Sequence, residues 1–335
     1  MQDCGPHASG TAPRPATSPI HRSRTTSHER RLVMAEHVIL GAGSIGTNIA
    51  RLLTDRGESV LIVTRSGSGP DHPLVTRVAA DASNASLLAE LSRGAKVIYH
   101  AANPPSYTQW ESMLPPLQTA AITAAKTNDA VLALTASLYS YGKQPGGRMN
   151  ERSPMTATGH KGRLRKRMWE QAQNSGIRTL EIRGSDYIGK NAAGVYSLVI
   201  EPALNKGRAA WMPGNLDMPH TFTYNKDMAT ALVTLAQDER AWGRAWHVPS
   251  PPAITLRDLA QKYAAAVGKP PIKLIQTPRF VMRTAGVFIP IAREIAEMDY
   301  QWYAPFHMDA TTTAQTFGLT ATDLDTAIHN QVGPR

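Results

Sequence analysis

Three glycines in the segment Gly41-Ala-Gly-Ser-Ile-Gly46 have the spacing that lets a backbone turn hold phosphate groups. Gly41 permits a tight turn, Gly43 lets a phosphate approach the main chain, and Gly46 allows a helix to pack closely against the preceding strand. Ser44 and Ile45 would begin that helix, where free amide groups and the helix dipole favour negative charge. The spacing therefore predicts a site for the pyrophosphate of a dinucleotide, with a purely structural strand–helix turn as the alternative.

The next apolar run ends in Val63-Thr64-Arg65, and this end indicates which dinucleotide to expect. NAD sites of this type usually place an Asp or Glu here, where the carboxylate holds the ribose 2′-hydroxyl. No carboxylate stands at this position, and Arg65 can instead grip a 2′-phosphate and stack on the adenine. The pattern favours NADP, with NAD as the second choice. The alternative for Arg65 is a solvated surface side chain.

Strand and helix patterns alternate along the first half of the chain, as they must if a parallel sheet positions these residues. After the glycine turn, apolar residues fall on one helical face until Gly57 ends the helix. Pro115-Pro116 is expected to open a later helix, and another is expected over 163–173. Right-handed crossovers would then place ligands at the carboxyl ends of the strands. The expected strands are 37–40, 59–63, 75–79, 96–100, 131–135 and 179–183.

The chain divides into three parts by composition. Residues 1–33 are rich in Pro, Ser, Thr and Arg and show no apolar periodicity, so we expect a disordered tail, or an upstream start with Met34 as the true start. Residues 34–190 are expected to form the NAD(P)-binding domain of an α/β, doubly wound (Rossmann) parallel sheet. Residues 191–335 are less regular, and a capping box beginning at Thr255 supports a smaller C-terminal substrate lobe with some return to the sheet.

Composition excludes several classes of function. The chain has 335 residues and a net charge of +10, but no nucleic-acid-binding motif accompanies the basic residues. Cys4 is the only cysteine, so no intrachain disulfide can form, and we expect a cytoplasmic protein. No run reaches the roughly 18 apolar residues of a membrane helix, and no metal-ligand spacing occurs. The expected partner is a small-molecule substrate, and the expected state is a monomer or homodimer.

Several short segments have a combined likeness to one known family. They include Tyr99-His-Ala-Ala102, Thr135-Ala-Ser-Leu-Tyr-Ser-Tyr-Gly142 and Arg183-Gly-Ser-Asp-Tyr-Ile-Gly189. With the glycine turn they make the chain, from His37 onward, resemble the short-chain dehydrogenase/reductase superfamily, in its extended and atypical branches of NAD-dependent epimerases/dehydratases. The resemblance implies roles for five residues: Asp81 would contact the adenine, the backbone of Ala101 and Ala102 would line the cofactor, Ser137 would be catalytic, and Lys166 would bind the nicotinamide ribose.

The sequence departs from that family at the usual proton donor. The family places a tyrosine four residues before the lysine, and here Gly162 stands four residues before Lys166. A substitute acid is therefore required, and Tyr139 is the first candidate because it lies two residues beyond Ser137 at the end of the fifth strand. Its phenol would need a cation such as Lys166 nearby to become useful at neutral pH. His160 is the second candidate.

A second departure concerns the substrate. Sugar-nucleotide members of the family carry an arginine where this chain has His220, so a nucleotide sugar is not the expected substrate. Tyr107 and Trp110 should lie over the nicotinamide, where they could stack on a substrate or simply pack against the small lobe. We expect an NAD(P)-dependent oxidoreductase or epimerase/dehydratase-like enzyme acting on a small hydroxyl or carbonyl substrate. The alternative is a catalytically silent NAD(P)-binding sensor or scaffold.

Overall fold

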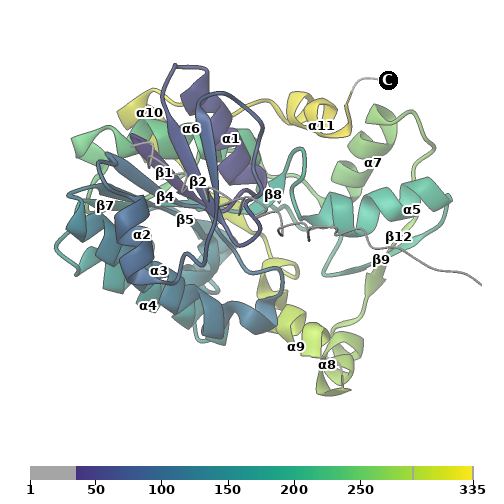
Figure 1. The fold of residues 1–335 in the computed structure, drawn as a ribbon. Helices are drawn as coiled ribbons and strands as arrows, with labels where there is room; N and C mark the ends of the chain where they lie inside the picture. Colours follow the sequence, from purple (N-terminus) through teal and green to yellow (C-terminus); the bar gives the residue numbers. More distant parts are fainter. Residues whose placement is uncertain (1–34, 289, 334–335) are drawn as a thin grey trace, which may run out of the picture. The chain divides into compact units, whose positions relative to one another are not determined.

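Short runs of Val, Ile and Leu form seven strands of one parallel sheet in the computed structural model, which describes residues 35–288 and 290–333 (Figure 1). The strand order β11-β7-β5-β4-β1-β2-β3 reverses direction between β1 and β4, as in a doubly wound fold. The strands are β1 (His37–Leu40), β2 (Val60–Thr64), β3 (Val75–Ala79), β4 (Val97–His100), β5 (Val131–Ser137), β7 (Thr179–Gly184) and β11 (Ala245–His247). The expected fold class is therefore confirmed, with each expected strand shifted at its ends by no more than two residues.

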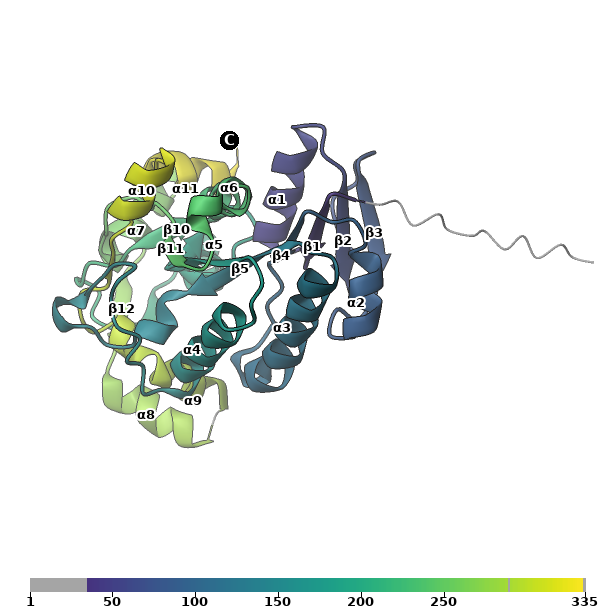
Figure 2. The same cartoon turned by 90° about the vertical axis from the view of Figure 1, so that its left-hand side faces the viewer.

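Helices cover both faces of this sheet (Figure 2). Helices α1 (Ser44–Thr54) and α6 (Asn225–Ala236) cover one face, and α2 (Ala85–Leu91), α3 (Trp110–Thr127) and α4 (His160–Gln173) cover the other. Alternate residues of one strand enter opposite cores: Ile39 packs on the α1 side, whereas Val38 and Leu40 pack on the α3 side. Burial on both faces explains why the strands read as continuous apolar runs.

One helix begins earlier than the sequence pattern suggests. Pro115-Pro116 does not open α3, because the helix starts at Trp110 and contains both prolines. The prolines remove two amide donors from its second turn. Burial of Trp110 and Leu114 against Leu164 of α4 outweighs that loss, since these side chains share one apolar cluster. Tertiary packing therefore places the start of this helix.

The second half of the chain adds small elements around a core of its own and returns α6 and β11 to the sheet. The two-stranded parallel pairs are β6 (Arg148–Met149) with β13 (His307–Met308), β8 (Asp186–Ile188) with β10 (Phe222–Tyr224), and β9 (Ala210–Pro213) with β12 (Leu274–Thr277). The remaining helices are α5 (Glu201–Lys206), α7 (Leu256–Ala266), α8 (Arg279–Phe288), α9 (Pro290–Glu297), α10 (Thr311–Phe317) and α11 (Leu324–Val332). The short helical turns are η1 (Tyr107–Gln109), η2 (Leu138–Tyr141), η3 (Pro145–Gly147), η4 (Tyr196–Ile200), η5 (Glu239–Ala241) and η6 (Asp299–Gln301).

The capping box expected at Thr255 is present, because the Thr255 hydroxyl accepts the Asp258 amide at 3.1 Å at the start of α7. The described residues belong to one compact unit, and the expected tail 1–33 lies outside them. Among residues 35–288 and 290–333, none of the helices has the length and apolar character of a membrane span.

Candidate active site

The glycine turn lies between the carboxyl end of β1 and α1, and close contacts explain two of its glycines. Gly41 has a φ of +96°, and a Cβ there would lie 2.8 Å from the Ala102 Cα. A Cβ on Gly46 would lie 2.0 Å from the Gly41 carbonyl oxygen. Any side chain at either position would push apart the turn, the helix or the backbone after β4. Ala101, whose amide donates to the Leu40 carbonyl at 3.1 Å, holds that backbone beside the turn.

Gly43 differs from the other two glycines because it faces open space. A Cβ built on it meets no described atom within 4 Å, and the residue is exposed. Gly43 is also the N-cap of α1, and no side chain caps this helix end. The first-turn amides, including those of Ser44 and Ile45, therefore face a cradle that a Cβ at Gly43 would fill. The cradle fits a dinucleotide pyrophosphate, which would accept hydrogen bonds from these amides.

Arg65 and Asp81 follow the ends of two adjacent parallel strands, β2 and β3. Both side chains are exposed. The Asp81 carboxylate accepts the Ser83 amide at 2.9 Å and the Ser83 hydroxyl at 2.7 Å. These bonds, with a smaller contribution from the Arg65 charge, hold the pKa of Asp81 below its usual value. Arg65 has no ion-pair partner among residues 35–288 and 290–333, so its guanidinium is available to a ligand.

Ser137 and Tyr139 leave the carboxyl end of β5 together. The Ser137 Oγ is buried and has no hydrogen-bond partner within the described part of the chain. The Tyr139 hydroxyl lies 2.8 Å from the Tyr107 hydroxyl, and its ring stacks on Trp110 with 5.9 Å between centroids. Burial, reinforced by the neighbouring Tyr107 and Asp186, raises the pKa of Tyr139 well above its usual value. The phenol therefore stays protonated and acts as a hydrogen-bond donor.

Lys166 does not lie where the spacing suggested. Its side chain is 41% exposed, and its ammonium pairs with Glu170 at 3.8 Å on the outer face of α4. The groups found to act on the Tyr139 phenol do not include Lys166, so the expected lowering of the phenol pKa is not found. The reason is helical register, because α4 turns Lys166 outward and Arg165 inward. Arg165 places its guanidinium 4.4 Å from the Trp110 ring centre.

Gly162 stands where the family has its tyrosine, and neighbouring atoms enclose it. A Cβ there would lie 2.3 Å from the Ala157 Cβ and 2.5 Å from the Tyr139 carbonyl oxygen. No side chain larger than hydrogen fits without moving η2. The neighbouring residue, Lys161, is buried instead, and its Nζ lies 5.2 Å from the Tyr107 ring centre. The absence of a tyrosine at this position, noted from the sequence, is thus accompanied by a buried ammonium group one residue earlier.

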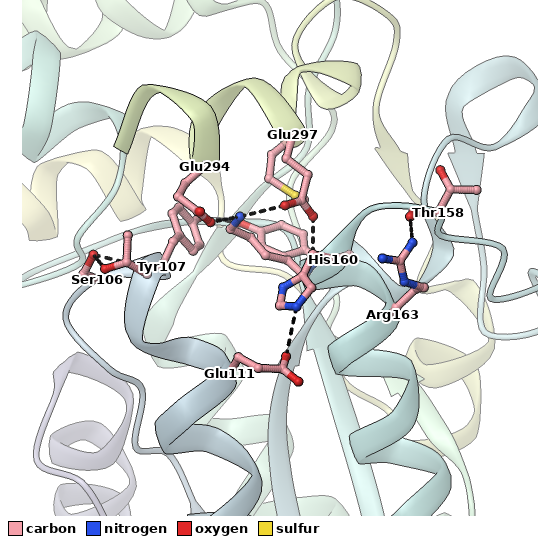
Figure 3. Close-up of polar contacts among 12 residues, drawn as sticks. Ser106, Tyr107, Glu111, Thr158, His160, Arg163, Glu294 and Glu297 are labelled. Carbon is pink, nitrogen blue, oxygen red and sulfur yellow. Dashed lines mark hydrogen bonds and ion pairs between the residues drawn. The ribbon is translucent and has the colours of Figure 1, made fainter. Parts of the chain in front are cut away.

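Two carboxylates of α9, those of Glu294 and Glu297 (labelled in Figure 3), hold Lys161 in place. The Lys161 Nζ donates to Glu294 and, at 3.0 Å, to Glu297, while the Lys161 backbone amide donates to Glu297 at 2.7 Å. His160, the second candidate acid, has a side chain that is 54% exposed and lies 3.4 Å from the carboxylate of Glu111. Its imidazole therefore belongs to a surface ion pair at the start of α4.

Behind the carboxyl end of the sheet lies a buried polar network that the sequence analysis missed. Arg183 donates through Nε to Glu181 at 2.6 Å, and its guanidinium lies 4.7 Å from the Tyr141 ring centre. The Tyr141 hydroxyl lies 2.7 Å from Nε2 of His247, whose Nδ1 lies 2.9 Å from the Asp309 carbonyl oxygen. A carbonyl only accepts, so Nδ1 carries the proton and Nε2 accepts from the phenol. Burial, followed by the Arg183 charge, lowers the pKa of His247 to about 3.

His220 occupies the place of the sugar-nucleotide arginine, and internal contacts surround it. Its side chain is 2% exposed, and its Nε2 lies 2.7 Å from the carboxylate of Asp186. The ring stacks on Trp302 at 4.2 Å and on Phe306 at 5.0 Å. Internal contacts therefore enclose the His220 ring, which has no guanidinium to hold a diphosphate.

A group of possible metal ligands lies at the opposite, amino end of β1. The ligand atoms of Glu36, His37 and Glu58 lie within 4.8 Å of one another. Each already has a partner: His37 pairs with Glu58, and Glu36 pairs with Lys96 at 2.8 Å. The group reads as an ion-pair network at the base of the sheet.

Comparison with known proteins agrees with this geometry. A model of the NAD dependent epimerase/dehydratase family matches residues 37–248. Among solved structures, the Bordetella bronchiseptica enzyme WbmH in complex with NAD+ is 21% identical, with a TM-score of 0.70 over 89% of this chain and 97% of that chain. DesIV, a dTDP-glucose 4,6-dehydratase from Streptomyces venezuelae, is 14% identical, with a TM-score of 0.70 over 88% and 95% of the two chains. A UDP-galactose 4-epimerase is 17% identical, with a TM-score of 0.65 over 88% and 97%.

At these identities the structural likeness establishes the fold and leaves the substrate open. Among proteins of curated function, none matches the sequence. The family model spans the glycine turn, the seven strands of the sheet up to β11, and the start of α4. On the strength of that match, the chain belongs to the NAD dependent epimerase/dehydratase family.

Proposed function

We propose that the protein is a cytoplasmic, NADP-dependent oxidoreductase that acts on a small hydroxyl or carbonyl substrate. The observation that carries the proposal is the open cradle at Gly43 before the uncapped end of α1. Ser44 and Ile45 would bind the pyrophosphate there through their amides, and Arg65 and Asp81 would hold the adenosine end. When bound, the nicotinamide gives or takes a hydride. The backbone of Ala101 and Ala102 would orient it over the carboxyl end of the sheet.

Ser137 and Tyr139 are our proposed catalytic pair. Carbonyl reduction leaves an alkoxide that needs a proton, and the protonated Tyr139 phenol can give it one through a hydrogen bond. The Ser137 hydroxyl, which is buried without a partner in the described chain, would orient the same substrate oxygen. Tyr107, which is partly exposed, would return a proton to Tyr139 across their 2.8 Å contact and take one up from solvent. A raised phenol pKa suits reduction better than alcohol oxidation, because oxidation requires the phenolate.

The substrate that we propose is small and is not a nucleotide sugar. Among the similar structures, MoeE5 is in complex with UDP-glucose and DesIV is a dTDP-glucose 4,6-dehydratase, and this is said of those two proteins alone. Here His220 is buried between Asp186 and Trp302, so it supplies no guanidinium to a diphosphate. The expectation of a monomer or homodimer without nucleic-acid or membrane partners stands alongside this proposal.

Cofactor choice provides the first prediction. NADP should bind more tightly than NAD, because the exposed Arg65 guanidinium can pair with the 2′-phosphate. A charge-assisted bond of this kind contributes about 1–3 kcal/mol, or roughly 5- to 150-fold in affinity. Calorimetric titration with NADP and with NAD checks this prediction. Arg65→Ala should reduce the affinity for NADP toward that for NAD. Arg93→Ala, which removes another exposed arginine, is the matched control; equal NADP and NAD affinities in the unmodified protein would refute the assignment.

A second candidate function is a catalytically silent sensor of the dinucleotide. The observation in its favour is the enclosed Gly162 with the immobilised Lys161, which together replace the usual acid. A sensor would bind NADP and show no hydride transfer with any carbonyl or alcohol. Screening NADPH oxidation over small ketones and aldehydes separates the two functions, since turnover with any of them excludes a purely silent protein.

A further inference from the structure

Arg165 is a partly buried cation with one hydrogen bond and no ion pair in the described part of the chain. On the inner face of α4, its Nη2 donates to the Asn103 side-chain oxygen at 3.1 Å. Its Nε is buried and has no partner within the described residues. Across the same residues, no carboxylate lies within ion-pair distance of the guanidinium. A guanidinium offers five donors and is rarely left unpaired in a protein interior.

The surrounding groups do not neutralise this charge. The carboxylate with the largest influence on Arg165 is that of Glu181, which already receives Arg183 Nε at 2.6 Å. The buried Arg183 and the partly buried Arg165 thus share the Glu181 carboxylate. The nearby His100 supplies no negative charge in either protonation state, and burial with the Arg165 charge lowers its pKa to about 4. The Arg165 guanidinium therefore has no carboxylate of its own among the described residues.

Other unsatisfied polar atoms gather at this end of the sheet. His100 ends β4, Ser137 ends β5, and Ser185 follows β7 directly; each has a buried side-chain nitrogen or oxygen without a partner in the described chain. Isolated orphan atoms are rare in native proteins, and a group of them around one unpaired cation indicates a missing polar ligand. Beside Arg165 lie Tyr107, which is partly exposed, and Asn103, which is exposed.

We propose that Arg165 binds the carboxylate of the substrate at the carboxyl ends of β4 and β5. A planar carboxylate matches the free edge of the guanidinium and supplies the missing negative charge. The proposal rests on the function given above and makes it more specific: the substrate is a hydroxy or oxo acid, with its reacting oxygen near Ser137 and Tyr139. The aromatic side chains of Tyr107 and Tyr139 beside the guanidinium favour an acid with a flat apolar part.

Benzoate, with benzamide as its neutral analogue of the same shape, tests this proposal without needing turnover. Calorimetry and thermal unfolding on the full chain, with and without saturating NADP, should show benzoate binding at least tenfold more tightly than benzamide. Arg165→Gln should remove that preference, and Arg165→Lys should weaken it because a lysine cannot bond bidentately. Arg163→Gln removes an exposed arginine of the same helix, and this variant should retain the preference for benzoate over benzamide. Without ligand, Arg165→Gln should melt no lower than the unmodified protein, because it removes a partly buried charge that has no ion-pair partner among the described residues.

Three results would overturn the proposal. Equal affinity for benzoate and benzamide would show that charge is not recognised. Unchanged benzoate binding in Arg165→Gln would place the anion elsewhere. Loss of NADP affinity in Arg165→Gln, together with competition between NADP and benzoate, would assign the guanidinium to the cofactor. If NADP does not bind but Arg165-dependent benzoate binding persists, the anion site stands and the oxidoreductase function fails.

Discussion

The residues that the structure brings to the start of α4 show why a spacing rule misled the search for the proton donor and its cation. Counting four residues from Gly162 selects Lys166, but α4 turns that side chain outward and sets Arg165 against the Trp110 ring. The sequence pattern does not separate the two residues, because the buried face of α4 includes Leu164, Met168 and Ala172 but neither Arg165 nor Lys166.

Substitutions at Tyr139 and Ser137 provide a prediction at this scale. Tyr139→Phe removes the proposed acid, and Ser137→Ala removes the hydroxyl that would orient the substrate oxygen. Each should reduce kcat by roughly a hundredfold or more while NADP affinity stays unchanged, because neither group is proposed to bind the cofactor. Steady-state kinetics with an accepted carbonyl substrate, alongside NADP titration of each variant, provides the measurement.

The control for that experiment is His160→Ala, since the exposed imidazole pairs with Glu111 at the surface. This substitution should reduce kcat much less than Tyr139→Phe or Ser137→Ala does. If Tyr139→Phe keeps full turnover and His160→Ala has none, His160 is the proton donor and the assignment to Tyr139 is wrong. Tyr107→Phe should give an intermediate loss, because it interrupts proton return across the contact between the two phenols.

Among the elements, strands were easier to predict than helix starts. A buried parallel strand needs apolar residues on both faces, so runs such as 60–64 stand out from their polar flanks. Helices α3 and α4 begin where Trp110 and Lys161 find partners far along the chain, and local sequence does not contain those partners. The same limit hid α9, whose carboxylates lie more than 130 residues from Lys161. Contacts of this range become visible only in the folded chain.

The attachment of α9 leads to a prediction for that element. Glu297→Gln removes the carboxylate that accepts both the Nζ and the backbone amide of Lys161. Lys161 is 1% exposed, so weakening its ion pairs leaves a buried charge less well compensated. We expect a loss of about 1–3 kcal/mol in unfolding free energy and faster amide hydrogen exchange in α9.

Glu90→Gln, at an exposed position of α2, is the matched control and should leave both quantities unchanged. Lys161→Met tests the same contact from the other side: it removes the buried ammonium and should increase exchange in α9 with a smaller loss of stability. If amide hydrogen exchange in α9 is unchanged in both Glu297→Gln and Lys161→Met, other contacts hold the helix.

At the scale of the whole molecule, buried histidines couple the polar interior to pH. His100 and His247 sit at the ends of β4 and β11, and burial beside Arg165 and Arg183 lowers their pKa values to about 4 and about 3. Charged imidazoles at these places would be repelled by the guanidinium groups of Arg165 and Arg183. The fold therefore depends on both rings staying neutral.

Stability should consequently fall on acidification from about pH 6.5. A histidine in the unfolded chain has a pKa near 6.5, so below that value the unfolded chain binds protons that the native protein does not. Each pH unit then costs about 1.4 kcal/mol per histidine, and the stabilisation is lost as pH falls through the native pKa values near 4 and 3. Urea unfolding at pH 7.5, 6 and 5 measures this slope.

His247→Gln isolates the histidine contribution from that of the carboxylates, which titrate equally in both proteins. Glutamine can still donate to the Asp309 carbonyl and accept from Tyr141, but it takes up no proton, so the variant should lose less stability between pH 6.5 and pH 5 by about 2 kcal/mol. His72→Gln, at an exposed loop position, should keep the slope of the unmodified protein. A slope in His247→Gln identical to that of the unmodified protein would show that His247 takes up its proton equally in the native and unfolded chains, and the buried network would then tolerate the added charge.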